Sequence, residues 1–291
     1  MDGNALIEVI KSGVPVLNSS ISAIAGAIVT TLFLRKNTLT AEFEKIKAGK
    51  FSEVIDDLLD SGKMSYFEYY KCKNFLEIAQ KADELHSDDG TIDSSHVDYD
   101  FDWFIRFFDY ASNISNDEMQ ILWAHVLARE VESPNTTSLT LLHTLSMMRR
   151  EQALAFRNIA RFALMDITGD FSHLLLFVSS NREAYEKENI TPTILKDIER
   201  LGLIECNFTE EYVFRRKKVF RTGNKAVTVY GDSHNQHKIK AGNVKFTKDG
   251  QLLYSVLDSD SRRYRSDILD FTITRFKNRN CQVVINEREI K

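Results

Sequence analysis

The chain has 291 residues, 43% of them hydrophobic and 27% charged, and a formal net charge of −4. A chain of this size can bury one large core or two smaller ones, and we expect two domains. Its three cysteines, Cys72, Cys206 and Cys281, are widely spaced and form no C-x-x-C pair, which argues against a disulfide framework or a thiolate zinc site and fits a reducing compartment.

The charge is distributed unevenly along the sequence. Residues 1–204 carry 20 Lys and Arg against 31 Asp and Glu, a net charge of −11, whereas residues 205–291 carry 18 against 11, a net charge of +7. Such an asymmetry is informative about partners rather than about fold. We therefore expect an anionic partner to bind at the C-terminal end.

The first element in chain order is a charge-free stretch of 23 residues from Ser12 to Leu34, closed by Arg35 and Lys36. A helix of about 20 apolar residues crosses the hydrocarbon core of a bilayer, so this stretch predicts a single transmembrane span. Lys11 alone precedes the stretch, whereas Arg35, Lys36, Lys45, Lys47 and Lys50 follow it. This asymmetry predicts an inner-membrane protein whose C-terminal body faces the cytoplasm.

The same stretch allows a second interpretation. Residues 21–34 form a tight apolar run of only 14 residues, and runs of that length also occur as buried helices. A cytoplasmic protein that oligomerises through this helix is therefore the alternative. In a membrane, small side chains at every fourth position would let two such helices pack closely; they are Ser22, Gly26 and Thr30.

The next segments are predicted to be helical and then irregular. Amphipathic patterns over residues 37–86, with a turn at Ser61-Gly62, predict a helical hairpin or stalk after the N-terminal segment 1–36. Residues 87–102 are polar, acidic and without helical periodicity, which is typical of a linker. The aspartates of this linker lack the spacing of a calcium-binding loop, so we expect no metal site there.

Residues 103–185 again show strong helical patterns. The run Ser115-Asn116-Asp117-Glu118 offers an N-cap and an acidic first turn for a helix through Glu130. A turn at Ser133-Pro134-Asn135 ends this helix, and two more helices follow it. We expect a helical domain with both tryptophans of the chain in its core.

Residues 186–291 mix helix and strand. A helix that ends in L-G-L-I, a basic hairpin and then F-T-x-x-G-x-x-L are together similar to a winged-helix module. The expected fold class is thus mainly α, with a C-terminal α+β winged-helix-like domain and one candidate N-terminal transmembrane helix. The C-terminal elements are a helix over 192–200, strands over 212–222 and 226–230, a helix over 248–257, a helix over 264–276 and a strand over 282–286.

Part of the sequence resembles a bacterial family catalogued as domain of unknown function 2806, over roughly residues 100–260. The residues that carry the resemblance are the run Asn113 to Glu118, Gln120, Leu122 to Ala124, Leu127, Ala128, Glu130, Pro134, Ser138, Leu142, Leu145 and the run Ala153 to Phe156. The chain departs from the family at Arg129, where a small residue is usual, and in its more membrane-like N-terminus. The resemblance implies no activity, because the family has none established.

A cluster of cations on and beside the predicted hairpin is the candidate binding site. Its members are Arg215, Arg216, Lys217, Lys218, Arg221, Lys225, Lys238 and Lys240. Such a cluster can neutralise the phosphates of nucleic acid. The alternatives are contact with anionic lipid, pairing with the acidic helical part of the chain, and a plain solvated surface. No recognition helix is evident, because the helix over 192–200 carries as many acidic as basic side chains.

Catalytic motifs are missing from the sequence. It contains no G-x-S-x-G elbow, P-loop, G-x-G-x-x-G, H-E-x-x-H or kinase motif. His234 and His237 resemble half of a metal site, but no Cys or carboxylate pattern completes it. We therefore expect no catalytic activity, no cofactor and no metal.

These observations predict a membrane-anchored, cytoplasm-facing binding or sensing protein, placed by analogy in antiphage defence or stress response. Its expected partners are membrane lipid, nucleic acid at the cation cluster, and either a second copy of the chain or another protein. One alternative is a soluble, nucleic-acid-binding winged-helix regulator that oligomerises through its N-terminal helix. Another is an effector that perturbs the membrane.

Overall fold

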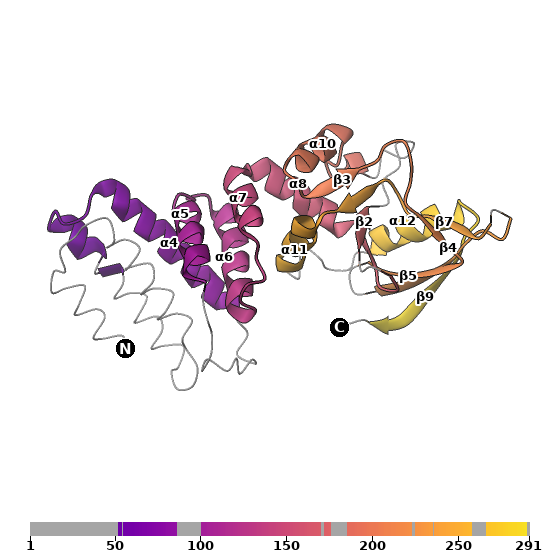
Figure 1. The fold of residues 1–291 in the computed structure, drawn as a ribbon, viewed down its shortest axis with the longest axis horizontal. Helices are drawn as coiled ribbons and strands as arrows, with labels where there is room; N and C mark the ends of the chain where they lie inside the picture. Colours follow the sequence, from indigo (N-terminus) through magenta and orange to yellow (C-terminus); the bar gives the residue numbers. More distant parts are fainter. Residues whose placement is uncertain are drawn as a thin grey trace. The chain divides into compact units, whose positions relative to one another are not determined.

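The computed structural model describes residues 52–53, 55–85, 100–169, 172–175, 185–222, 225–234, 236–257 and 266–289. The chain divides into two compact units, Met1–Ser146 and Met147–Lys291, which are described one at a time. Figure 1 shows the helices of the first unit and the mixed helices and strands of the second.

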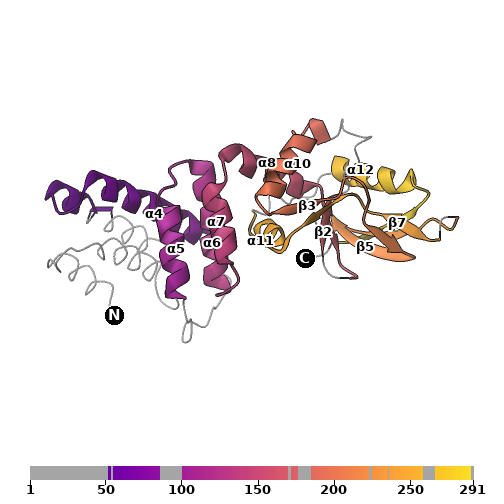
Figure 2. The ribbon, with the colours of Figure 1, turned by 45° about the horizontal axis from the view of Figure 1, so that its top comes forward.

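The first unit consists of helices that surround an aromatic core. In two views of the ribbon, α4, α5 and α6 lie side by side (Figures 1 and 2). Phe75 lies 5.0 Å from Phe108, and Phe107 lies 5.3 Å from Trp123, between ring centroids. Both tryptophans are buried, as the sequence predicts. The helices are α4 (Tyr66–Leu85), α5 (Phe101–Ala111), α6 (Asp117–Glu132) and α7 (Leu139–Met147).

The start of α6 follows from local capping. Asn116 precedes the helix with an extended backbone, and its side-chain oxygen accepts a hydrogen bond from the Met119 amide at 3.2 Å. Asp117 and Glu118 then place negative charge beside the unsatisfied amides of the first turn, where it is stabilising. The predicted helix start is therefore confirmed, and α6 ends at Glu132, just before the predicted turn.

The second unit is built on a seven-stranded antiparallel sheet with the strand order β3-β8-β2-β1-β5-β6-β9. A separate two-stranded sheet pairs β4 with β7. The strands are β1 (Ala163–Asp166), β2 (His173–Leu175), β3 (Ile204–Cys206), β4 (Val213–Arg215), β5 (Lys217–Thr222), β6 (Lys225–Tyr230), β7 (Lys238–Lys240), β8 (Val244–Phe246) and β9 (Gln282–Glu289). The helices are α8 (Arg150–Arg161), α10 (Pro192–Arg200), α11 (Lys248–Val256) and α12 (Ser266–Lys277).

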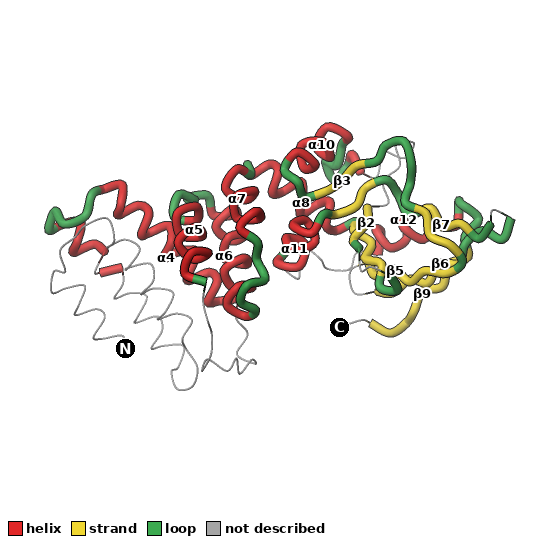
Figure 3. The backbone as a smooth tube through the Cα atoms, viewed as in Figure 1, coloured by secondary structure: helices red, strands yellow, loops and turns green. Residues whose placement is uncertain are grey.

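The large sheet carries different layers on its two faces (Figure 3). On one face, Phe220 of β5 stacks on Phe276 of α12 at 5.6 Å, and this core also includes Ile239 of β7. On the other face, at the end formed by β3, β8 and β2, Phe246 packs against Phe156 of α8 and Tyr254 of α11. Each end of the sheet is therefore stabilised by apolar burial from a different side.

A close backbone approach explains the glycine of the F-T-x-x-G-x-x-L motif. Thr247 caps α11 by accepting the Gly250 amide at 3.0 Å. A Cβ atom at Gly250 would lie 1.8 Å from the carbonyl oxygen of Leu203, so a side chain cannot fit between α11 and the segment that enters β3. The helix predicted over 192–200 is also confirmed, and it leads into β3.

The predicted fold class is wrong for the protein as a whole. The described structure is about half helical and contains a large antiparallel sheet, whereas a mainly helical chain with a C-terminal α+β winged-helix-like domain was expected. The predicted hairpin lies inside this sheet, because β1 and β9 pair with its two outer edges. β1 and β2 fall where helix was expected, since strands of four and three residues are too short to show a period that separates them from a buried helix.

The prediction of a transmembrane helix is also corrected. Among the residues that the structure describes, no helix combines the length and the apolar character needed to cross a membrane. The charge-free stretch from Ser12 to Leu34 and its residues Ser22, Gly26 and Thr30 lie outside the described residues.

Candidate functional site

The structure separates the eight predicted cations into groups. Three of them, Lys218, Arg221 and Lys225, lie apart from the others. The remaining five gather where β4 and β7 meet the start of β5, and we call these five residues the basic surface: Arg215, Arg216, Lys217, Lys238 and Lys240.

The two-stranded sheet presents three of these cations on one face. Arg215 of β4 lies directly opposite Lys238 of β7, and Val213 lies opposite Lys240. The alternate positions, Phe214 and Ile239, face the apolar core instead. Because side chains along a strand alternate between its two faces, Arg215, Lys238 and Lys240 all project from the outer face of this sheet.

Arg216 links the two sheets through its backbone. Its amide donates a hydrogen bond to the His237 carbonyl oxygen, and its own carbonyl oxygen accepts one from the Gly231 amide, both at 2.8 Å. Its φ of 69° lies in the left-handed region, which is unfavourable for a residue with a side chain. A Cβ atom at Gly231 would lie 2.0 Å from the His237 carbonyl oxygen, so this junction requires glycine at that position.

Lys217 begins β5 and lies beside an aromatic ring. It pairs across the sheet with Tyr230, the last residue of β6, and its Nζ atom is 5.7 Å from the centroid of the Tyr230 ring. Both side chains are exposed. The basic surface therefore continues onto the face of the large sheet.

The charges of the basic surface are not neutralised within the described ranges. No ion pair there involves any of its five side chains, and four of the five are exposed while Lys238 is half-buried. The carboxylate of the nearby Glu211 forms its ion pair with another residue, because it binds the guanidinium of Arg279 at 2.6 Å. Residues 147–291 as a whole carry 26 Lys and Arg against 19 Asp and Glu, a net charge of +7. A positive potential that favours anions follows.

The other three predicted cations have different surroundings. Lys218 faces the interior, where its Nζ atom binds Asp166 Oδ2 at 2.9 Å, and the Asp166 side chain is only 1% exposed. Arg221 is half-buried, and its charge acts on the buried His173. Lys225 pairs with Thr222 at the end of the β5–β6 hairpin remote from Lys217.

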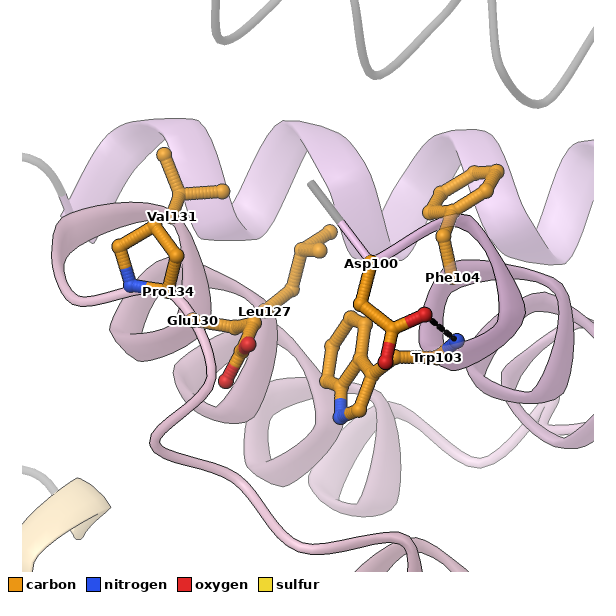
Figure 4. Close-up of a pocket in the computed structure, with 7 residues that line it drawn as sticks. All are labelled: Asp100, Trp103, Phe104, Leu127, Glu130, Val131 and Pro134. Carbon is orange, nitrogen blue, oxygen red and sulfur yellow. Dashed lines mark hydrogen bonds between the residues drawn. The ribbon is translucent and has the colours of Figure 1, made fainter. Parts of the chain in front are cut away.

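A small pocket in the first unit offers no binding site for a sizeable ligand (Figure 4). Its volume of about 20 Å³ has room for about one water molecule, whereas small-molecule sites are many times larger. The pocket is lined by Asp100, Trp103, Phe104, Leu127, Glu130, Val131 and Pro134. The carboxylate of the buried Glu130 already has hydrogen-bond partners in the protein, because it accepts hydrogen bonds from the amides of Asn135 and Thr137.

Several residues that suggested a family resemblance have structural roles. Gln120 is buried, donates to Glu77 and to the Ile114 carbonyl oxygen, and accepts from Lys81 at 2.8 Å. Glu130 holds the loop after α6, as described above, and Ser138 accepts the Leu141 amide at 3.0 Å. These three polar residues therefore hold α4, α6 and α7 and the loop after α6 in place.

The described residues include no group of three or more His, Cys, Asp or Glu side chains that could hold a metal ion. The thiols are also poor nucleophiles. Burial raises the pKa of both Cys72 and Cys206 to about 12, and burial likewise raises the pKa of Cys281. Among the described residues, the basic surface is therefore the candidate binding site.

The sequence analysis did not single out Tyr230, whose ring lies beside Lys217. The sequence feature that could have pointed to Tyr230 is the alternation of side chains along the predicted strand. This alternation places Tyr230 on the same face as Thr228 and Ala226, at the strand end that Gly231 follows. The pairing with Lys217 depends on the register of β5 against β6.

Comparison with known proteins gives one match. A model of a family described as "Protein of unknown function (DUF2806)" matches residues 66–268. No curated protein matches the chain, and no solved structure matches it.

Proposed function

Since the chain belongs to the DUF2806 family of proteins of unknown function, we infer its role from its own surfaces. We propose that it is a non-catalytic protein that binds nucleic acid through the basic surface. The observation that carries this proposal is the gathering of five cations without an ionic partner in the described structure. Phosphate groups are the natural counter-ions of such a surface.

The arrangement favours a polymer over a small anion. A site for one small anion needs donors that converge in a concave pocket. Here Lys238 and Lys240 are separated along β7 by two residues, roughly 6.6 Å, and both project from the exposed face that also carries Arg215. An extended row of cations is suited to a ligand with repeated phosphates, such as a nucleic-acid backbone.

The test is binding of a fluorescently labelled oligonucleotide to the full chain, measured by anisotropy over a series of salt concentrations. We expect the logarithm of the association constant to fall linearly with the logarithm of salt concentration, with a slope of about −3 to −5 if most of the five cations contact phosphates. The double variant Arg215→Glu/Lys238→Glu should weaken binding at least about tenfold at the same salt concentration.

A matched control separates the surface from the net charge. Lys187 and Lys248 are exposed lysines of the second unit outside the basic surface, so Lys187→Glu/Lys248→Glu changes the net charge by the same amount. This control should bind like the unmodified protein. Equal weakening by both double variants, or no binding by the unmodified protein at low salt, would refute the proposal.

A further inference from the structure

We propose that the ligand of the basic surface is single-stranded nucleic acid, and that one of its bases stacks on Tyr230. This inference rests on the proposed function and specifies its ligand class. It arises from the face of the large sheet that adjoins the basic surface, where an aromatic ring, a cation and an amide lie in one row.

The row crosses three neighbouring strands. Lys217 of β5 pairs with Tyr230 of β6, and Tyr230 pairs in turn with Gln282 of β9. Residues that pair directly across strands have side chains on the same face of a sheet. The Tyr230 side chain is 38% exposed, and Lys217 and Gln282 are also exposed. A ring, a phosphate-binding ammonium group and a hydrogen-bonding amide are thus presented together.

The next row on this face supplies apolar surface. Val219, Thr228 and Val284 are paired in the same way, and Val284 is 42% exposed. Helix α12 packs on the opposite face of these strands, against Phe220 and Val227. Figure 2 shows α12 on one side of the strands near β5 and β7. On this face Val219 is half-buried and Thr228 is buried, so the partly apolar platform consists of the exposed Tyr230 and Val284.

The platform and the basic surface are one continuous structure. Gly231 follows Tyr230 directly, and its amide binds the carbonyl oxygen of Arg216, the residue before Lys217. The His237 carbonyl oxygen accepts the Arg216 amide, which connects this point to β7. A strand whose phosphates follow Arg215, Lys238 and Lys240 can thus bring its next bases to Tyr230.

The chemistry of this platform selects single strands. In a duplex the faces of the bases are stacked on one another and only their edges reach the grooves. In a single strand the faces are accessible, and aromatic side chains beside a basic groove bind them without sequence preference. The cation of Lys217 near the ring can bind the phosphate of the stacked nucleotide, since a lysine ammonium acts as a flexible point charge.

The test compares Tyr230→Thr with Tyr230→Phe in the full chain, using labelled oligo(dT), oligo(U) and a duplex. Threonine removes the ring but keeps a residue favourable in strands, and phenylalanine keeps the ring. We expect Tyr230→Thr to weaken single-strand binding by about 5- to 150-fold, the range for removing one stacked base. Tyr230→Phe should change it by less than about threefold, because stacking needs only the ring.

The outcomes distinguish this inference from the proposed function. Duplex binding, measured at low salt, should be weaker than single-strand binding and unchanged by Tyr230→Thr. Unchanged single-strand binding by a folded Tyr230→Thr variant, or equal loss for single strands and duplex, would overturn the stacking inference while the charge-reversal result still supports the basic surface. If Tyr230→Thr weakens the binding of oligo(dT) alone, the stacked ligand is single-stranded DNA. If it weakens the binding of oligo(U) alone, the stacked ligand is single-stranded RNA. Failure of the charge-reversal test would overturn both.

Discussion

At the scale of single residues, His173 is a buried imidazole in an aromatic environment. Its ring lies between Phe246 and Tyr254, 4.5 Å from the latter, and its Nδ1 atom has no hydrogen-bond partner. Burial, and then the charge of Arg221, lower its pKa from 6.5 to about 4. The folded protein therefore keeps His173 neutral at a pH where the unfolded chain binds a proton.

This depressed pKa predicts a loss of stability in mild acid. The contribution of His173 is fully present above pH 6.5 and is lost as the pH falls toward 4, because only the unfolded state takes up the proton in that window. The full loss is about 3 kcal/mol. Urea unfolding at pH 7 and at pH 5 should show a fall in unfolding free energy that His173→Phe reduces. An identical pH dependence in both proteins would contradict the assignment.

At the scale of elements, the junction of β4 and β5 combines a backbone constraint with a charge. Arg216 occupies a left-handed conformation that glycine adopts without cost, yet it carries one of the five cations. Strained residues often coincide with binding sites, since the surrounding structure must hold them in place. Here the hydrogen bonds to Gly231 and His237 hold Arg216.

The variant Arg216→Gly tests this combination directly. We expect its thermal stability to be unchanged or raised, by up to about 1 kcal/mol, because the left-handed strain disappears. Binding should nevertheless weaken, with the salt slope smaller in magnitude by about one because one phosphate contact is lost. A destabilised variant, or one with an unaltered salt slope, would show that Arg216 serves the fold alone.

At the scale of the whole molecule, burial raises the pKa of all three thiols. Cys72 lies in the first unit, and Cys206 and Cys281 lie in the second. With a pKa of about 12 for Cys72 and Cys206, the thiolate fraction at neutral pH is about three orders of magnitude below that of an exposed cysteine.

Thiol labelling therefore reports the folding of both units. We expect none of the three cysteines to react with a thiol reagent during minutes at pH 8 in the native protein, and all three to react in denaturant. Single Cys→Ser variants assign each labelling event to its unit. Rapid native labelling at Cys206, which is less buried than the other two, would contradict the raised pKa of its thiol.

The sequence by itself determined the parts of the protein that depend on neighbours along the chain. The capped start of α6 at Asn116, the helix after Thr191 and the cap at Thr247 each rest on a side chain that accepts a hydrogen bond from an amide three residues further along the chain. The family resemblance was also readable over roughly residues 100–260 from a pattern of spaced residues, and the family model matches residues 66–268. The charge of the C-terminal end followed from composition alone.

Only the tertiary structure decided which residues share a surface. β1 and β5 pair across more than 50 positions of sequence, and that pairing places Lys218 against Asp166 and removes it from the basic surface. The register of β4 with β7 sets Arg215 opposite Lys238, and that of β6 with β5 and β9 places Tyr230 between Lys217 and Gln282. Strand pairing joins residues far apart in the sequence, and a register shift by one residue reverses every side chain, so the surface depends on contacts that local patterns do not encode.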